Sequence, residues 1–156
     1  MPGVCRGFTL IELLISVAIS GILISAALAS YRGMSAKQQA KQAGIGLVSD
    51  LKNYQQKALA GQKPSVCTVA LQGYQVTYVD SNSYSVKALC PPGGPAATEV
   101  SLPNEVVFSA AFNPVQIVFP VLGGQVTGAQ TIIVKKDPYQ YQVTIEASGV
   151  IRGEML

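Results

Sequence analysis

One carboxylate lies within an apolar segment near the N-terminus. Glu12 comes just before a stretch from Leu13 to Tyr31 that carries no charged residue. A carboxylate in a membrane span is costly, about 2.5–3.5 kcal/mol at mid-bilayer for comparable acids, and therefore points to a function. Its chemistry would be charge pairing, because an acid among apolar helices is stabilised by a cationic partner.

Catalytic chemistry is not indicated elsewhere in the chain. The 156 residues include no histidine, which is the commonest general base and metal ligand. No nucleophile or phosphate-loop motif appears. The acids are widely spaced and lack the density of a calcium site; they are Asp50, Asp80, Glu99, Glu105, Asp137, Glu146 and Glu154. We therefore expect no enzyme activity, no metal and no cofactor.

The element that would position Glu12 is a helix over residues 8–31. Its charge-free part would span roughly 28 Å at about 1.5 Å per residue, close to the ~30 Å hydrocarbon core of a bilayer. Two other interpretations stay open for this segment alone. One is a secretory signal peptide cleaved after Ala27-Leu28-Ala29, although the apolar run is long for that role and contains Glu12. The other is a plain membrane anchor.

The helix is predicted to continue through residues 32–62, because no proline occurs between Tyr31 and Pro64. Apolar residues at helical spacing predict one buried face, formed by Ile45, Val48, Leu51, Ala58 and Leu59. Gly61 and Pro64 mark the end of the helix. Such a helix of about 50 residues would be ~75 Å long, so its second half must pack outside the membrane.

Residues 63–156 have a β composition. Short runs rich in Val, Thr and Tyr predict strands at Val66–Leu71, Tyr74–Val79, Tyr84–Leu89, Val106–Ala111, Gln116–Phe119, Thr131–Lys135, Gln142–Glu146 and Val150–Arg152. No helices separate them, so an antiparallel sheet is expected. The predicted fold class is α+β, with a long N-terminal helix packed on a C-terminal antiparallel sheet.

The stretch Arg6-Gly7-Phe8-Thr9-Leu10-Ile11-Glu12-Leu13-Leu14 resembles the N-terminal motif of type IV prepilins and type II secretion pseudopilins. The resemblance implies that residues 1–7 are a leader, that prepilin peptidase cuts between Gly7 and Phe8, and that the new Phe8 amine is methylated. It also implies that Glu12 of one subunit pairs with the Phe8 amine of a neighbour during assembly.

The resemblance also bears on cysteines and location. Cys5 would leave with the leader, and Cys67 and Cys90 would remain as a pair expected to form a disulfide in an exported domain. The precursor would be a single-pass protein of the inner (cytoplasmic) membrane, in contact with lipid, with a periplasmic or extracellular domain that later joins a filament. Arg32, Lys37 and Lys41 oppose this orientation on a simple positive-inside count, but the cysteine pair and the resemblance favour it.

Beyond residue 60 the chain looks most like H-type minor pseudopilins and FimT-type minor pilins, on the basis of Val48-Ser49-Asp50-Leu51 and the segment from Val134 to Arg152. The expected function is a minor structural subunit in protein secretion. Its partners would be other pilins or pseudopilins, the prepilin peptidase and an inner-membrane assembly platform. The alternative is a minor pilin of a DNA-uptake or adhesion pilus with a ligand-binding domain. In that case a basic and aromatic surface would bind nucleic acid, formed by Lys135, Lys136, Arg152, Tyr139 and Tyr141. A simpler explanation is that these residues lie at a solvated sheet edge, where lysines discourage pairing with another strand.

Overall fold

A single long helix, α1, runs from Leu10 to Leu59 in the computed structural model of the chain. The structure describes residues 9–91, 94–103 and 105–156, without the side chains of residues 26–30 and 32. It divides into two units, Met1–Ser35 and Ala36–Leu156. The prediction of a helix of about 50 residues is confirmed.

The end of α1 has the sequence expected of a helix stop. Gly61 has a left-handed backbone, with φ of +60°, which glycine adopts without steric cost. Its N–H donates to Ala58 O at 3.0 Å, and the N–H of Gln62 donates to Lys57 O at 2.9 Å. These two bonds form a Schellman motif and satisfy carbonyls that the helix leaves free.

The β part of the second unit contains two antiparallel sheets. The first has the order β3-β2-β1-β5 and the second β4-β6-β7-β8. The first sheet comprises β1 (Gly73–Tyr78), β2 (Ser83–Leu89), β3 (Thr98–Ser101) and β5 (Gln116–Pro120). The second comprises β4 (Val107–Phe108), β6 (Gln130–Lys136), β7 (Tyr139–Ile145) and β8 (Ile151–Met155), and a short 3-10 helix, η1 (Val121–Gly123), follows β5. The α+β prediction is therefore confirmed, with two sheets in place of one.

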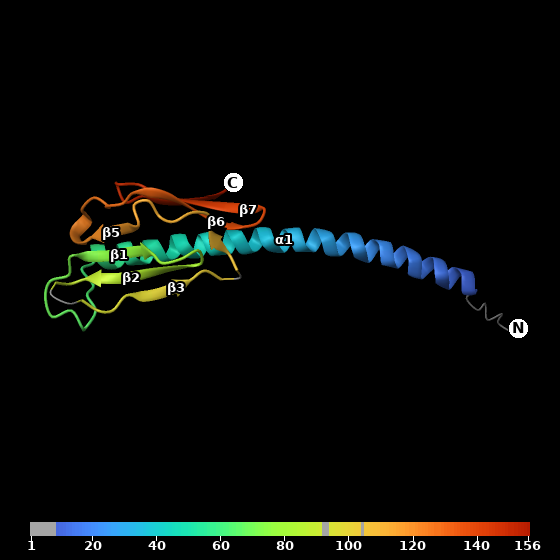
Figure 1. Cartoon of the computed structure of the whole chain (residues 1–156), viewed down its shortest axis with the longest axis horizontal. Helices are drawn as coiled ribbons and strands as arrows, with labels where there is room; N and C mark the ends of the chain where they lie inside the picture. The colour runs from blue at the N-terminus through green and yellow to red at the C-terminus, as the bar shows by residue number, and fades with distance from the viewer. Residues whose placement is uncertain (1–8, 92–93, 104) are drawn as a thin grey trace, which may run out of the picture. The chain divides into compact units, whose positions relative to one another are not determined.

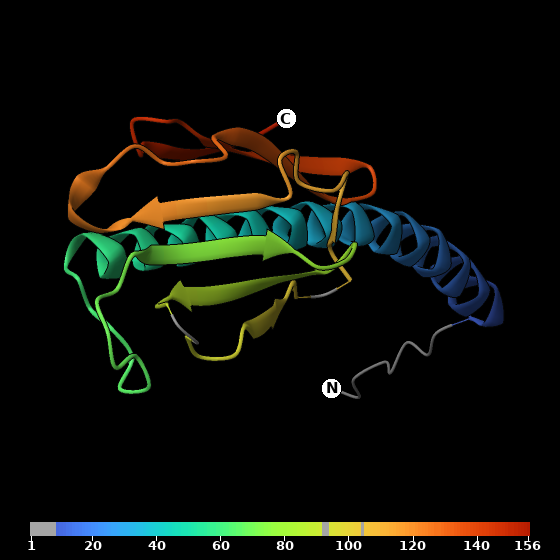
Figure 2. The same cartoon turned by 60° about the vertical axis from the view of Figure 1, so that its left-hand side comes forward.

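Both sheets lie alongside the later part of α1 (Figure 1, Figure 2). Alternate strand residues form the core with one face of the helix, and the core includes Leu47, Leu51, Val76, Val134 and Val143, each at most 2% exposed. The Tyr84 hydroxyl on β2 donates to Asp50 Oδ2 of α1 at 2.7 Å. Gln55 of α1 donates from Nε2 to Gly149 O, in the turn before β8, at 2.6 Å. The helix is thus fixed to each sheet by apolar packing and one side-chain hydrogen bond.

Close packing of α1 against the second sheet depends on a glycine. A Cβ at Gly44 would overlap the ring of Tyr141 on β7. A Cβ at Gly46, two residues later, would have no neighbouring atom within 4 Å. Gly44 therefore lets the helix backbone approach the tyrosine ring, whereas Gly46 faces away from the sheets.

Four details of the predicted fold were wrong. The strand predicted at Val106–Ala111 is reduced to the two residues of β4. Val66–Leu71 is not a strand but a loop that the Cys67–Cys90 disulfide ties to the end of β2, where it has no partner strand. Strand β3 was missed, because its polar sequence Thr-Glu-Val-Ser belongs to an exposed sheet edge. The buried face of α1 was misplaced in part: Ile45 and Leu59 are about half exposed, and Ala40, Ala43 and Leu47 are buried instead.

The first unit is helical from Leu10 onward, and its large apolar side chains between Leu10 and Ile24 are exposed. Among the residues that the structure describes, no helix is both long and apolar enough to be a candidate membrane span.

Candidate functional site

The start of α1 is organised around Thr9 and Glu12. The backbone N–H and the hydroxyl of Thr9 both donate to Glu12 Oε2, at 2.9 and 2.8 Å. In return the Glu12 backbone N–H donates to Thr9 Oγ1 at 3.3 Å, and the Leu13 N–H donates to Thr9 O at 3.3 Å. This reciprocal arrangement is a capping box, with Thr9 as the N-cap residue.

The capping box defines what the Glu12 carboxylate can do. The carboxylate lies at the positive end of the helix dipole, where a negative charge is stabilised. A carboxylate has about four acceptor positions, so two bonds from Thr9 leave capacity for a further donor such as an amine. Thr9 was not among the predicted site residues, although the Thr-x-x-Glu spacing before an apolar run is the sequence pattern of this cap.

Three serine hydroxyls farther along the described part of the first unit donate hydrogen bonds within the helix. Ser16 donates to Glu12 O at 2.7 Å, Ser20 to Ser16 O at 2.7 Å, and Ser25 to Gly21 O at 2.8 Å. Each of these serines is thereby satisfied by a carbonyl four residues earlier. Polar groups bonded in this way can enter an apolar environment at lower cost than free ones.

Gly7 and Phe8, the predicted cleavage point, lie outside the described residues, as does Cys5. The structure therefore describes Glu12 and its cap but not the amine proposed as its partner.

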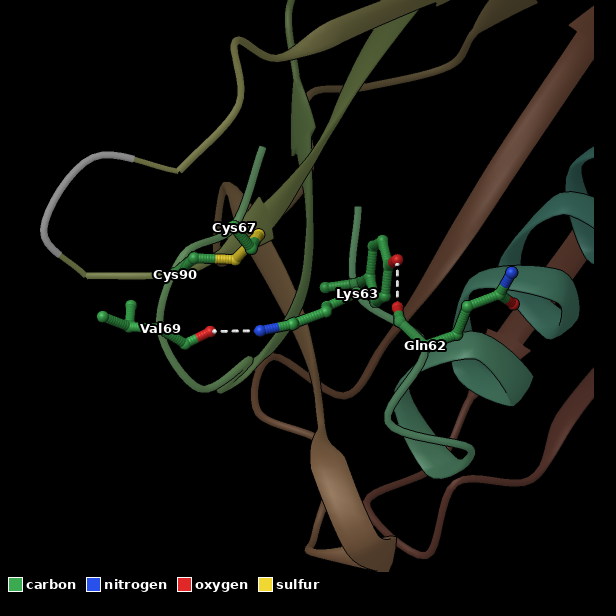
Figure 3. The surroundings of a disulfide bond; sticks show 6 residues. Gln62, Lys63, Cys67, Val69 and Cys90 are labelled. Atoms are coloured by element: carbon green, nitrogen blue, oxygen red, sulfur yellow. Dashed lines mark hydrogen bonds between the residues drawn. A yellow bond between two sulfur atoms is a disulfide. The ribbon is translucent and has the colours of Figure 1, made fainter. Parts of the chain in front are cut away.

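The predicted disulfide between Cys67 and Cys90 is present (Figure 3). Their Cα atoms are 5.8 Å apart, and both residues are at most 4% exposed. The bond ties the loop after α1 to the end of β2. Beside it, Lys63 Nζ donates to Val69 O at 3.5 Å, and the Tyr74 hydroxyl donates to Gln62 O at 2.7 Å. These contacts fix the path of the chain as it leaves the helix.

The cations considered for nucleic-acid binding each lie near a carboxylate. Lys136 Nζ donates to Glu105 Oε2 at 2.9 Å and holds the pKa of that carboxyl below its ordinary value. Lys135 lies 3.9 Å from Asp137, and Arg152 lies 3.6 Å from Glu146. Local acids thus offset the positive charge that a phosphate backbone would need.

Metal-ligating groups do not converge in the described part of the chain, where no three Cys, Asp or Glu side chains form a candidate site. The widely spaced acids are used in other ways: Asp50 accepts the Tyr84 hydroxyl, and Asp80 Oδ1 accepts the Asn82 N–H at 2.9 Å.

The family comparison falls on the segment that contains the capping box. Residues 4–28 match the family described as the prokaryotic N-terminal methylation motif. No curated protein and no solved structure matches the chain. Proteins with this motif are structural subunits rather than enzymes: they are made as membrane-anchored precursors, processed by prepilin peptidase and assembled with other pilins. The chain therefore carries, over residues 4–28, the N-terminal methylation motif that type IV prepilins and pseudopilins share.

Proposed function

We propose that this chain is a minor pseudopilin or minor pilin, cleaved between Gly7 and Phe8, methylated at Phe8 and assembled through α1. The observation that carries the proposal is Glu12, a single carboxylate held by a cap at the start of a helix with exposed apolar side chains. Processing would create an amine four residues before this carboxylate.

The Glu12 carboxylate and the Phe8 amine of a neighbouring subunit form the central contact of the proposed assembly. An ion pair in an apolar helix bundle fixes axial register, because moving one helix separates the charges. The capping bonds from Thr9 hold the carboxylate in place and leave it able to accept the amine.

Residues 8–31 would hold the precursor in the inner membrane, where it meets the peptidase and the assembly platform. The domain would then lie on the exported side. The buried Cys67–Cys90 disulfide supports this location, because such bonds form and persist in oxidising compartments.

A role in protein secretion is favoured over a DNA-uptake pilus. Lys135, Lys136 and Arg152 all lie within 4.0 Å of a carboxylate, which weakens the case for nucleic-acid binding through these residues.

Two substitutions of Glu12 test the proposal. Glu12→Ala removes both the charge and the capping acceptor, whereas Glu12→Gln removes the charge and keeps an oxygen for the cap. Both variants should be cleaved normally but should enter filaments poorly, since both lose the partner for the Phe8 amine. Incorporation is measured by immunoblotting of sheared filaments, with Ser16→Ala as a control that removes a hydroxyl from the same helix. Normal incorporation of Glu12→Gln would contradict the proposed ion pair.

A further inference from the structure

The last strand of the second sheet has a free edge. Among the described residues, β8 pairs only with β7 and ends the order β4-β6-β7-β8. At the two ends of this ladder, Val150 O accepts the Glu146 N–H at 2.9 Å, and the Leu156 N–H donates to Gln140 O at 3.1 Å. An antiparallel strand alternates its bonding direction, so every second residue between these ends directs its N–H and C=O to the free edge. These residues are Ile151, Gly153 and Met155.

The centre of this edge carries no side chain. Gly153 is exposed, and a Cβ at this position would overlap the ring and hydroxyl of Tyr141. A glycine within a strand permits close approach of another backbone. The free N–H and C=O groups in the middle of β8 are therefore accessible to an incoming strand.

The charges of β8 are complementary to those of a second β8 that runs in the opposite direction. With Gly153 opposite Gly153, Arg152 of each copy lies opposite Glu154 of the other. Both side chains are exposed, and Glu154 has no ion pair in the described part of the chain. Arg152 lies 3.6 Å from Glu146, but a guanidinium has five N–H donors and can bind a second carboxylate. Opposite charges directly across two strands stabilise a sheet.

The same alignment pairs apolar residues on either side of the charges. Ile151 lies opposite Met155, and Val150 lies opposite Leu156. In the single chain Val150 is 39% and Leu156 is 62% exposed, so each would cover the other. The residues that point outward also meet one another. Three such pairs give about six backbone hydrogen bonds, because each pair exchanges two.

Other alignments of the two strands are disfavoured. A shift of two residues in one direction places Arg152 opposite Arg152, and a shift in the other direction places Glu154 opposite Glu154. Like charges directly across two strands destabilise a sheet. A shift of one residue leaves the outward-pointing N–H and C=O groups unmatched. The charge pattern thus selects the alignment centred on Gly153.

We propose that β8 is a docking edge for β8 of a second copy, and that the two second sheets join into one continuous antiparallel sheet. The contact is isologous, because the same residues of both copies form it around a two-fold axis at Gly153. Charged side chains on edge strands usually prevent such pairing. In β8 they favour it, because the strand carries one charge of each sign at matched distances from its centre.

The two-fold axis determines which copies can meet. It reverses the direction of α1 as well as that of β8, because residues 36–59 of α1 lie alongside the sheets of the second unit (Figure 1, Figure 2). Neighbours in a filament whose helices share one direction therefore cannot form this contact, and it joins copies that belong to two filaments. Such a contact rests on the proposed filament role and does not involve Glu12.

Cysteine cross-linking of the full chain in detergent micelles tests the alignment. Val150→Cys and Leu156→Cys are made separately in a Cys5→Ser background, and both positions are exposed, so the fold should be kept. In the proposed pair the two cysteines lie opposite each other with Cα atoms about 4.5 Å apart, which suits a disulfide. A mixture of the two variants should give disulfide-linked dimers under mild oxidation. Either variant alone should not, because two cysteines at the same position would be roughly 20 Å apart.

Charge exchange then tests the pairing of Arg152 with Glu154. Arg152→Glu in both cysteine variants should lower the dimer yield about tenfold, because two attractive pairs become repulsive. Adding Glu154→Arg exchanges the two charges within each strand and should restore the yield, which also shows that the variants are folded. Lys87→Glu is the matched control, since it makes the same charge change on an exposed residue of β2.

Three results would overturn the docking of β8: no dimer from the mixture, equal yields from the mixture and from either variant alone, or a loss with Arg152→Glu that Glu154→Arg does not restore. A chain that is cleaved after Gly7 in cells but fails this test contradicts the β8 contact alone. A chain that is never cleaved contradicts the proposed function instead.

Discussion

At the level of single residues, Thr9 and Glu12 show how a short motif can serve two purposes. The Thr-x-x-Glu spacing satisfies backbone N–H groups at the start of α1. The same spacing holds a carboxylate close to the position where processing is proposed to create an amine. Glu12 could be singled out from the sequence because a charge in an apolar run is costly, whereas the contribution of Thr9 depends on local hydrogen bonds.

Replacing Thr9 tests the cap. Thr9→Ala removes the hydroxyl and should destabilise the first turn by about 1 kcal/mol. Amide hydrogen exchange at Glu12 and Leu13 of the full chain in micelles should then be about fivefold faster. Thr9→Ser keeps the hydroxyl and should exchange like the unmodified chain. Equal exchange in all three chains would show that the cap does not stabilise the helix start.

Tyr84 gives a pH-dependent prediction. Burial, and then the hydrogen bond to Asp50, raise the pKa of Tyr84 above its ordinary value of 10.0. The unfolded chain therefore loses the Tyr84 proton at lower pH than the folded chain. The contribution of protonated Tyr84 to the stability of the folded chain is complete below about pH 10 and declines above it. Each such tyrosine lowers the free energy of unfolding by about 1.4 kcal/mol per pH unit in that range.

Tyr84→Phe should therefore reduce the dependence of stability on pH above 10. Burial also raises the pKa of Tyr54 and Tyr74, so part of the slope should remain. At neutral pH the substitution should cost about 1.5–3 kcal/mol, since Asp50 loses a donor. Chemical denaturation followed by circular dichroism from pH 7 to 11 measures both effects. An unchanged slope would contradict the role given to Tyr84.

At the level of elements, the most regular sequence patterns were the most informative. The proline-free run and Gly61 correctly predicted α1 and its end. Hairpin strands such as β1 and β2 followed from alternating Val and Tyr residues. Val66–Leu71 has the same composition but lies in a loop, because strand formation also needs a partner strand, and no local pattern specifies one. Strand β3 lacks an apolar alternation, since an exposed edge does not require one.

Two glycines of α1 should respond in opposite ways to alanine. Gly44→Ala places a methyl group against the Tyr141 ring and should destabilise the domain by about 1–3 kcal/mol. Gly46→Ala meets no atom within 4 Å and should stabilise it by up to about 1 kcal/mol, because alanine favours the helix. Urea denaturation of the two variants measures the difference. Similar effects for both would contradict the packing of α1 against β7.

At the level of the whole molecule, the fold class followed from the order of one helix and many strands. The division into two sheets did not. It depends on which strands pair across long separations, such as β1 with β5 and β4 with β6. Similar apolar strands offer several such pairings, and no local sequence pattern selects among them.

The disulfide should contribute substantially to the stability of the β-sheet domain. Cys67 and Cys90 are 23 residues apart, and a loop of this size gives about 3 kcal/mol by restricting the unfolded chain. Replacing both cysteines by serine should lower the urea midpoint accordingly, with Cys5→Ser as the control. Because the control residue lies in the proposed leader, its replacement should leave the stability of the domain unchanged. A midpoint that is unaffected by the double substitution would contradict this contribution.

The central claim is that processing at Gly7 creates the amine that Glu12 requires. Mass spectrometry of the mature chain, isolated from cells that contain prepilin peptidase, tests it directly. The account predicts a chain that begins with N-methylated Phe8. A mature chain that begins near Ser30 would show cleavage by an ordinary signal peptidase, would remove Glu12 from the protein, and would contradict the account.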